Sequence, residues 1–287
     1  MVGLTIKEKL KYGIGAIGSL PFVSPVIFDR TVRQFLTKVP GSHFLYGDGW
    51  NRLHPFDRVN GTNTSGSVSA ADLRARCSHP ANAHTNLYGG SQPSVVRRAL
   101  ATLPQLETCC FVDLGCGKGR PLIVASEFPF RKIVGVELSE DLAEVARTNA
   151  AVISERHPER TPIQVEVGDA AAYPIPAGDV VLFLYHSFGT ELVAKVELAI
   201  RAALAAESRR LYVVSYNPVN GACFDESPVL IRRFARMLSY SREERGYGPD
   251  LSDAVVIWQG GSTPPPTELA DAKIIIVTPG SRAEVTP

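Results

Sequence analysis

Short apolar runs alternate with helix-like segments through the middle of the chain, and this alternation restricts the possible folds most strongly. The runs read as strands and lie at 109–114, 132–136, 163–167, 180–185 and 211–216. The segments between them carry helix signals, such as Ser139 in an N-cap position ahead of Glu140 and Asp141. Because strands that alternate with helices build parallel sheets, we predict an α/β fold with helices on both faces of the sheet.

A glycine-rich turn follows the first of these strands. Its sequence is Val112-Asp113-Leu114-Gly115-Cys116-Gly117-Lys118-Gly119-Arg120. Glycines let the backbone turn sharply and approach a ligand closely. A dinucleotide fingerprint needs a small residue where this chain has Arg120. An acid beside the turn, here Asp113, repels a pyrophosphate but suits a ligand with an ammonium group. S-adenosylmethionine (SAM) is such a ligand, because it has an amino acid tail, a sulfonium and no phosphate.

Two more acids come at the ends of the next two strands. Glu137 ends the second strand, where a carboxylate can accept hydrogen bonds from both hydroxyls of a ribose. Asp169 follows the third strand, where it would meet the adenine amino group while Ala170 offers its backbone N–H. Because the carboxyl ends of parallel strands share one edge of the sheet, we expect the three acids in one crevice. We therefore predict SAM as cofactor, S-adenosylhomocysteine (SAH) as product and no metal.

Three segments resemble motifs I, II and III of the class I (seven-β-strand, Rossmann-like) SAM-dependent methyltransferases. They are FVDLGCGKGR, VGVELS and VGDA, and the likeness covers about residues 88–258. Two further predicted strands, at 229–238 and 254–258, fit the reversed sixth and seventh strands of that family. The segments FDRVNGTNTSG, FPFRKIVGVELS and YNPV are similar to a bacterial group of such enzymes whose substrates are mostly unassigned.

The resemblance implies a role for each motif residue. Asp113, Gly115 and Gly117 would line the methionine end of SAM, Glu137 would bind the ribose, and Asp169 with Ala170 would bind the adenine. We also place Cys116, Leu138 and Tyr185 among the cofactor-binding residues. The fold implied is a mostly parallel seven-stranded sheet with helices on both faces, plus an N-terminal lid segment.

A further likeness concerns Tyr88-Gly89-Gly90-Ser91-Gln92-Pro93, which precedes the helix before the first strand. In seven-strand protein lysine methyltransferases, a segment with Tyr, Pro and Thr in this place closes over the cofactor. Ser91 and Gln92 stand in for the hydroxyl-bearing residues of that segment. The likeness makes Tyr88 a candidate SAM contact, and a plain surface loop is the alternative.

The acceptor side is expected at the ends of the fourth and fifth strands. The fourth ends in Tyr185-His186-Ser187-Phe188, where relatives in the family often carry Asn-Pro-Phe after the tyrosine. His186 is a candidate general base near neutral pH, or a histidine that only bonds a neighbouring loop. Tyr185 is the second candidate catalytic residue. Asn217, after the fifth strand, either orients a substrate or caps its turn.

The chain divides into three expected parts. They are an N-terminal cap or lid segment (1–85), a SAM-dependent methyltransferase domain (86–262), and a Pro-rich linker with a C-terminal strand or tail (263–287). Uncharged residues 12–28 follow Lys7, Lys9 and Lys11, which resembles a secretory signal. Pro21 and Pro25 break this run, so a packed cap or a homodimer contact is favoured over membrane contact.

Composition limits which binding partners and which cellular compartment we expect. A net charge of +1 gives no sign of a dedicated nucleic-acid binder. The five cysteines fit no zinc pattern and indicate reduced thiols in a cytoplasmic protein. His79 and His84 lack a third ligand at a sensible spacing, which argues against a metal.

The predicted function is methyl transfer from SAM to an oxygen or nitrogen nucleophile of a small molecule or peptide. Two alternatives stay open. One is a protein lysine N-methyltransferase, and the other is a SAM-binding or membrane-edge scaffold without enzymatic activity.

Overall fold

A computed structural model represents the 287-residue chain. It describes residues 52–76, 87–185, 188–248 and 251–261, the backbone of 274–278 and 281–285, and the isolated positions 26, 32 and 36. The expectations for His79, His84, His186 and the Pro-rich linker lie outside the described residues, as do those for residues 12–28 apart from Val26.

A seven-stranded sheet with the order β5-β4-β3-β6-β7-β9-β8 forms the centre of the molecule. Its strands are β3 (Cys110–Leu114), β4 (Lys132–Glu137), β5 (Ile163–Val167), β6 (Val180–Tyr185), β7 (Arg210–Tyr216), β8 (Ile231–Ser239) and β9 (Ser252–Gly261). β9 pairs antiparallel with both β7 and β8, whereas β3 to β7 pair parallel with one another. The mostly parallel seven-stranded sheet is thus confirmed. Of the two last strands, β9 alone is reversed relative to the others.

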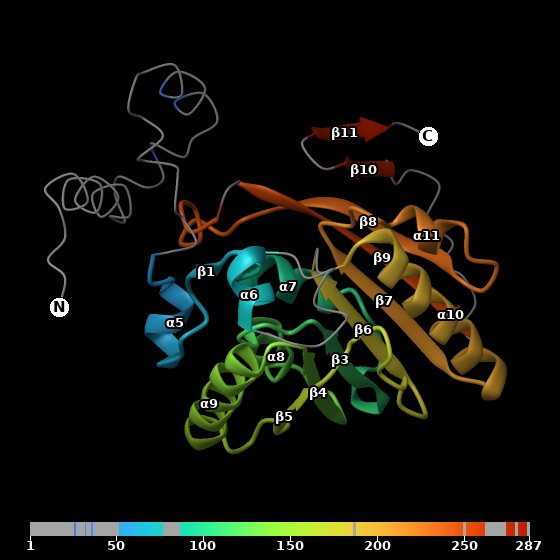
Figure 1. The fold of residues 1–287 in the computed structure, drawn as a ribbon, viewed down its shortest axis with the longest axis horizontal. Coiled ribbons are helices and arrows are strands. Elements are labelled where there is room, and N and C mark those ends of the chain that lie inside the picture. The colour runs from blue at the N-terminus through green and yellow to red at the C-terminus, as the bar shows by residue number, and fades with distance from the viewer. Residues whose placement is uncertain are drawn as a thin grey trace, which may run out of the picture.

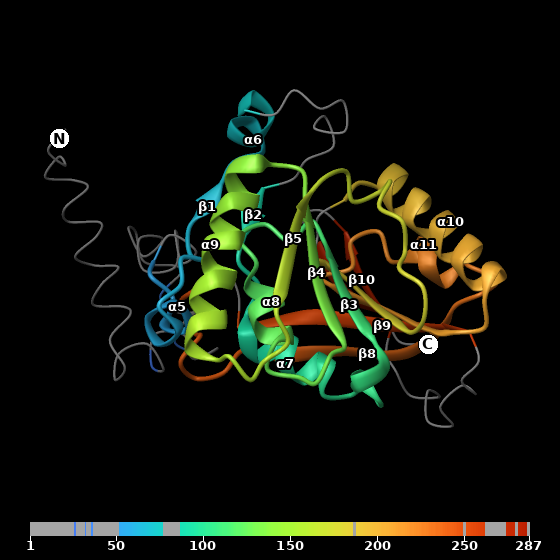
Figure 2. The same cartoon turned by 90° about the horizontal axis from the view of Figure 1, so that it is seen from below.

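Helices cover both faces of this sheet, as the alternating pattern predicted (Figures 1 and 2). On one face lie α7 (Pro93–Leu100), α8 (Arg120–Ala125) and α9 (Glu140–Arg156), and on the other lies α10 (Thr190–Ala206). Each face has its own apolar core, one including Val95, Leu122 and Phe111, the other Val193, Ile200 and Leu182. β3 and β6 are apolar on both sides because each is covered twice.

From β3 the chain builds the sheet first in one direction, through β4 and β5, and then in the other direction, beginning with β6 on the opposite side of β3. The parallel register pairs Leu114 with Val136 on one side and with Leu184 on the other. The carboxyl ends of β3, β4 and β6 therefore meet at one edge of the sheet. In open α/β sheets, ligands bind at such a topological switch point.

The segment before α7 contributes elements that the sequence patterns did not predict. These are α5 (Pro55–Asn60), β1 (Ser67–Val68), α6 (Ala70–Arg76) and β2 (Tyr88–Gly89), and β1 pairs antiparallel with β2. α5 and β1 lie beside α9 in both views (Figures 1 and 2). A hydrogen bond of 3.0 Å from Arg156 to the Val59 carbonyl joins α9 to α5.

Four short elements complete the described chain. The 3₁₀ turn η3 (Leu106–Thr108) leads into β3, and α11 (Ala222–Asp225) follows β7. The expected C-terminal strand is the first half of a separate hairpin, β10 (Ile274–Thr278) with β11 (Ser281–Val285). Among the described residues, the helices are all too short or too polar to span a bilayer.

Candidate cofactor and acceptor site

The glycine loop joins β3 to α8 at the switch point. Gly115, Gly117 and Gly119 have φ values of 78°, 54° and 83°, a region that residues with a Cβ rarely adopt. The backbone N–H groups of Gly115 and Cys116 donate to the Val136 carbonyl at 2.8 and 3.0 Å. The loop is therefore fastened to the end of β4, and the N-terminal turn of α8 begins directly behind it.

Asp113 lies near the end of β3 and is 1% exposed. Its Oδ2 atom has no hydrogen-bond partner among the described residues. Burial, together with the charge of Glu137, raises the pKa of the Asp113 carboxyl well above its ordinary value. An unpartnered buried carboxyl oxygen is costly. A cation beside it, such as an ammonium group, would supply the missing partner and stabilise the ionised form.

Glu137 ends β4 and is 9% exposed. Its two carboxylate oxygens accept hydrogen bonds from the backbone N–H of Gly117 at 2.8 Å and of Ser139 at 2.9 Å. Burial raises the pKa of Glu137, and the hydrogen bonds from the Ser139, Gly117 and Leu138 backbone act against that rise. A carboxylate has about four acceptor positions, so this group retains capacity for the hydroxyls of a sugar.

Asp169 and Ala170 follow β5. The Gly168 N–H donates to the Glu137 carbonyl at 2.9 Å, which places this turn beside the end of β4. The half-buried Asp169 carboxylate accepts from the Ala171 N–H at 2.9 Å, and Ala170 is buried. The Asp169 side chain therefore caps its own turn, next to Glu137 and at the same edge of the sheet.

Tyr88 covers the glycine loop. A Cβ atom on Gly117 would lie 2.4 Å from Cε2 of the Tyr88 ring, so the ring packs directly on the glycine backbone. The Tyr88 hydroxyl donates to the Thr64 carbonyl at 2.8 Å, and Lys118 Nζ lies 5.3 Å from the ring centre. Tyr88 thus packs on the glycine loop, and its role as a SAM contact stays a prediction.

Sequence patterns missed a buried polar group beside the loop. Arg120 is 3% exposed and donates to Thr64 Oγ1 at 2.7 Å, to the Thr64 carbonyl at 3.0 Å and to the Ser91 carbonyl at 3.0 Å. Its guanidinium lies 3.8 Å from the Asp57 carboxylate. The signal in the sequence was a large cation following the last glycine of the loop, which excluded a dinucleotide fingerprint but did not show its partner.

The acceptor-side residues at the ends of β6 and β7 pack together. The rings of Tyr185 and Tyr216 meet edge to face with centres 4.5 Å apart. Asn217 has a φ of 50° and uses both ends of its amide, since Nδ2 donates to Asp253 at 2.9 Å and Oδ1 accepts from the Ala254 N–H at 3.2 Å. These contacts favour the turn-capping interpretation of Asn217 over substrate orientation.

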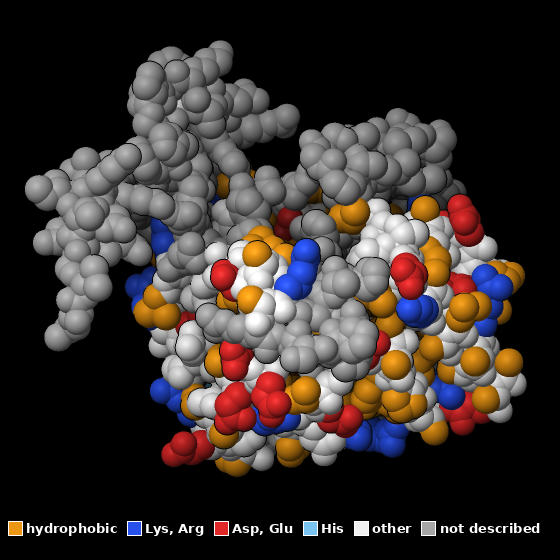
Figure 3. All heavy atoms as spheres, in the orientation of Figure 1, with side chains coloured by type: hydrophobic (Ala, Val, Ile, Leu, Met, Phe, Trp, Pro, Cys, Tyr) orange, Lys and Arg blue, Asp and Glu red, His pale blue; other side chains and the backbone are white. Residues whose placement is uncertain are grey.

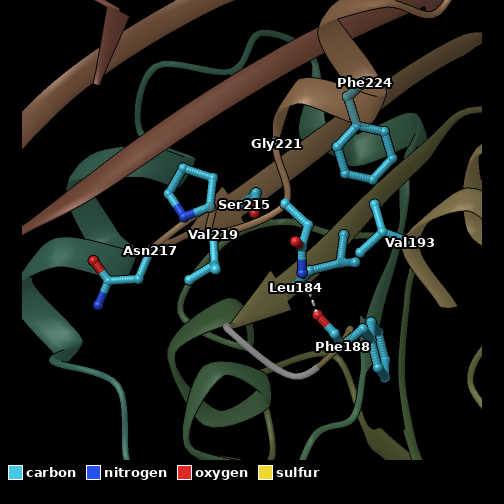
Figure 4. Close-up of a pocket in the computed structure, with 10 residues that line it drawn as sticks. Leu184, Phe188, Val193, Ser215, Asn217, Val219, Gly221 and Phe224 are labelled. Carbon is cyan, nitrogen blue, oxygen red and sulfur yellow. Dashed lines mark hydrogen bonds between the residues drawn. The ribbon is translucent and has the colours of Figure 1, made fainter. Parts of the chain in front are cut away.

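A small pocket lies next to these residues (Figure 4). Its volume is about 20 Å³, room for about one water molecule or methyl group. A hydrogen bond of 2.8 Å from Asn220 to the Phe188 carbonyl ties the two loops that form it. The Asn217 amide points away from the pocket. The described lining has no charged side chain and includes Leu184, Phe188, Val219 and Phe224.

A metal site was not expected, and the described residues contain no group of three or more His, Cys, Asp or Glu side chains placed to hold a metal ion. His79 and His84 lie outside them.

Comparison with known proteins finds one family model that matches the central part of the chain. Residues 111–209 match the family model described as "Methyltransferase domain". The trans-aconitate 2-methyltransferase of Afipia carboxidovorans is 36% identical over 88 residues, which are 30% of this chain and 30% of that protein. The match thus spans less than a third of the length of that relative.

Two solved structures illustrate the structural likeness. The RNA methyltransferase from Salinibacter ruber, in complex with SAH, is 25% identical with a TM-score of 0.37, covering 63% of this chain and 99% of that one. Cofactor-bound Rv0187 from MTB is 17% identical with a TM-score of 0.44, covering 61% and 83%.

Residues 111–209 thus resemble a methyltransferase domain. The motifs in this segment, and the seven-stranded sheet of which it forms the first four strands, resemble those of the class I, SAM-dependent methyltransferases.

Proposed function

We propose that the whole chain is a SAM-dependent methyltransferase that methylates an oxygen or nitrogen nucleophile of a small molecule or peptide. The observation that carries this proposal is the pair of buried carboxyl groups at the glycine loop. Asp113 has an oxygen without a described partner, and Glu137 bonds the Gly117 N–H. Both lie in the segment that resembles a methyltransferase domain, at the switch point of the sheet.

The residues present fit SAM. When bound, SAM supplies a methyl group on a positively charged sulfur, ready for in-line displacement. Asp113 would bind the ammonium of the methionine end, and the glycine loop would allow close approach of the backbone there. Glu137 would accept the ribose hydroxyls, and Asp169 and Ala170 would meet the adenine. Cys116, Leu138, Tyr88 and Tyr185 would complete the walls.

Catalysis at this site would depend first on how the acceptor is positioned relative to the methyl group. Holding the acceptor atom close to the methyl group and in line with the sulfur supplies much of the acceleration of such a reaction. A hydroxyl or ammonium acceptor must also lose its proton. His186 is our candidate base, because its imidazole follows Tyr185 at the end of β6, and Tyr185 is the second candidate.

The charged side chains on one face of the described residues are of mixed sign. On the described part of the face in Figure 3, Lys and Arg lie interspersed with Asp and Glu. A nucleic-acid partner is typically met by a continuous basic patch. Because the name of the curated relative gives trans-aconitate as its substrate, small carboxylic acids are the first acceptors to screen.

Calorimetry with SAM and SAH tests the cofactor assignment, with NAD as the control ligand. We expect SAM and SAH to bind and NAD not to bind. Absence of binding by SAM and SAH at millimolar concentration would contradict the proposal. Incubation with SAM and metabolite pools, followed by mass spectrometry for the gain of one methylene, would then identify the acceptor.

A protein lysine N-methyltransferase is the second candidate, because the segment that begins at Tyr88 resembles the one that closes over the cofactor in such enzymes. The His186→Ala variant separates the two. A large loss of rate supports a base-assisted reaction, while a nearly intact rate supports a lysine acceptor in a channel without a histidine base. The scaffold alternative predicts SAH binding with no methyl transfer to any acceptor.

A further inference from the structure

The residues 57–66, here called the cap loop, pack directly against the glycine loop. They come from the part of the chain that the sequence suggested as a lid. Lys118 of the glycine loop donates to the Ser65 carbonyl at 2.6 Å. Asn149 of α9 accepts from the Asn63 N–H at 2.8 Å and donates to the Lys118 carbonyl at 2.9 Å. One side chain of α9 thus holds both loops.

A buried hydroxyl lies at the centre of this contact. Thr64 Oγ1 donates to Asp57 Oδ1 at 2.7 Å and accepts from Arg120 Nε at 2.7 Å. Asp57, Thr64 and Arg120 are all buried. Although burial raises the pKa of Asp57, hydrogen bonds from Ser65 and Thr64 and the charge of Arg120 hold it below its ordinary value. The buried pair is therefore charged and connected through Thr64.

Tyr88 connects Thr64 to the part of the glycine loop where the cofactor would bind. Its hydroxyl donates to the Thr64 carbonyl at 2.8 Å, while its ring packs on Gly117. The same Thr64 carbonyl also accepts from Arg120 at 3.0 Å. Loss of the Thr64 position would therefore release the Tyr88 ring from the glycine loop as well.

We propose that Thr64, with Asp57 and Arg120, is a positioning residue for the cofactor: it couples docking of the cap loop to SAM binding at Gly117. The inference rests on the proposed function. Coupling between two sites is reciprocal. If cap-loop docking strengthens SAM binding, bound SAM or SAH must stabilise the docked cap loop by the same free energy.

Two substitutions at one position separate the hydroxyl from the rest of the side chain. Thr64→Val removes the hydroxyl and keeps the shape, whereas Thr64→Ser keeps the hydroxyl. Thr148→Val is the matched control, because Thr148 is exposed on α9 and, among the described residues, its hydroxyl donates to the carbonyl of Glu144 in its own helix. Calorimetry measures the Kd for SAH, and hydrogen exchange with mass spectrometry measures protection of 57–66 against protection of 210–216.

We expect Thr64→Val to weaken SAH binding by at least about fivefold, a typical lower value for allosteric coupling. Exchange of the cap loop should rise in this variant while that of β7 stays unchanged. In the wild type, SAH should slow exchange of the cap loop, and this effect should shrink in Thr64→Val. Thr64→Ser should restore most of the affinity, and Thr148→Val should behave as the wild type.

The outcomes distinguish this inference from the function beneath it. If the wild type binds SAH and Thr64→Val binds it equally well with a loosened cap loop, the coupling is wrong and the function stands. If the wild type binds neither SAM nor SAH, both are wrong. Should Thr64→Val fail to fold, Lys118→Met is the alternative variant, because it removes the hydrogen bond between the glycine loop and the Ser65 carbonyl. An unchanged Kd for SAH in Lys118→Met would count against the coupling.

Discussion

The Glu137 carboxylate and the Gly117 backbone N–H form a hydrogen bond of 2.8 Å that joins the end of β4 to the glycine loop. The other oxygen of the same carboxylate accepts from the N–H of Ser139, the residue whose side-chain oxygen caps the start of α9. One acid thus fixes the loop before α8 and the loop before α9. In the proposed complex, the sugar of the cofactor would lie between these two loops.

The Glu137→Gln variant should weaken SAH binding by about tenfold or more, because hydrogen bonds to a charged acceptor contribute roughly 1.5–3 kcal/mol each. A glutamine amide has only one acceptor oxygen. Its NH₂ group would therefore face one of the two backbone N–H groups, that of Gly117 or that of Ser139, and that hydrogen bond would be lost. Calorimetry with SAH measures the effect. Glu140→Gln, at the exposed first residue of α9, should leave the Kd unchanged. Equal affinities for both variants would argue against ribose recognition by Glu137.

The Asp113→Asn variant should be more stable than the wild type without ligand and bind SAH more weakly. Burial raises the pKa of Asp113 in the folded chain, so stability is lost as the pH rises from the ordinary value of about 3.8 through the folded pKa. Asparagine cannot ionise and so removes this loss at neutral pH. Thermal unfolding and calorimetry measure the two effects; a destabilised variant with unchanged affinity would contradict the account.

The Gly117→Ala variant should lose about 1–3 kcal/mol of stability, because a non-glycine residue with positive φ is strained. Its Cβ would also meet the Tyr88 ring at 2.4 Å. Chemical denaturation measures the loss. Gly168→Ala is the control, since the nearest atom to its Cβ would be 4.0 Å away. Adding Tyr88→Ala to Gly117→Ala should recover part of the loss, and no recovery would mean that the ring does not pack there.

Stability should fall as the pH falls from 6.5 toward 3 because of His54. Burial, followed by the charge of Arg120, lowers the pKa of His54 from 6.5 to about 3. The neutral ring accepts from the Phe56 N–H at 3.1 Å and bonds Gln92 at 3.0 Å. In this window the unfolded chain binds a proton that the folded chain does not. The slope reaches up to about 1.4 kcal/mol per pH unit.

Urea denaturation of the wild type and His54→Gln over this pH range isolates the histidine. The variant should be less stable near neutral pH and show a shallower dependence on pH. Parallel curves for the two proteins would mean that His54 is protonated in the folded chain.

Local sequence patterns were enough for the central sheet. The apolar runs of β3 and β6, and the acids at or just after the ends of β3, β4 and β5, can be recognised from neighbouring residues in the sequence. Parallel pairing then brings the carboxyl ends of these strands to one edge of the sheet. The C-terminal hairpin was half predicted, since β11 (Ser281–Val285) has no apolar run of its own. α11 was missed because four residues are too few to show helical periodicity.

The contact between Thr64 and Arg120 could not be predicted in this way. The two residues are 56 positions apart, and nothing local to Thr64 specifies which side chain its hydroxyl meets. The same holds for Tyr88 on Gly117, where the sequence indicated a candidate contact but not the stacking of ring on backbone. For Asn217, two interpretations were open, and only the positions of Asp253 and Ala254 favour one.

A crystal structure with SAH bound tests the central claim most directly. The account predicts the ribose hydroxyls on the Glu137 carboxylate, the ammonium on Asp113 Oδ2, and the Tyr88 ring against the ligand at Gly117. A ligand phosphate against Gly117, or a Glu137 side chain turned away from the sugar, would contradict it.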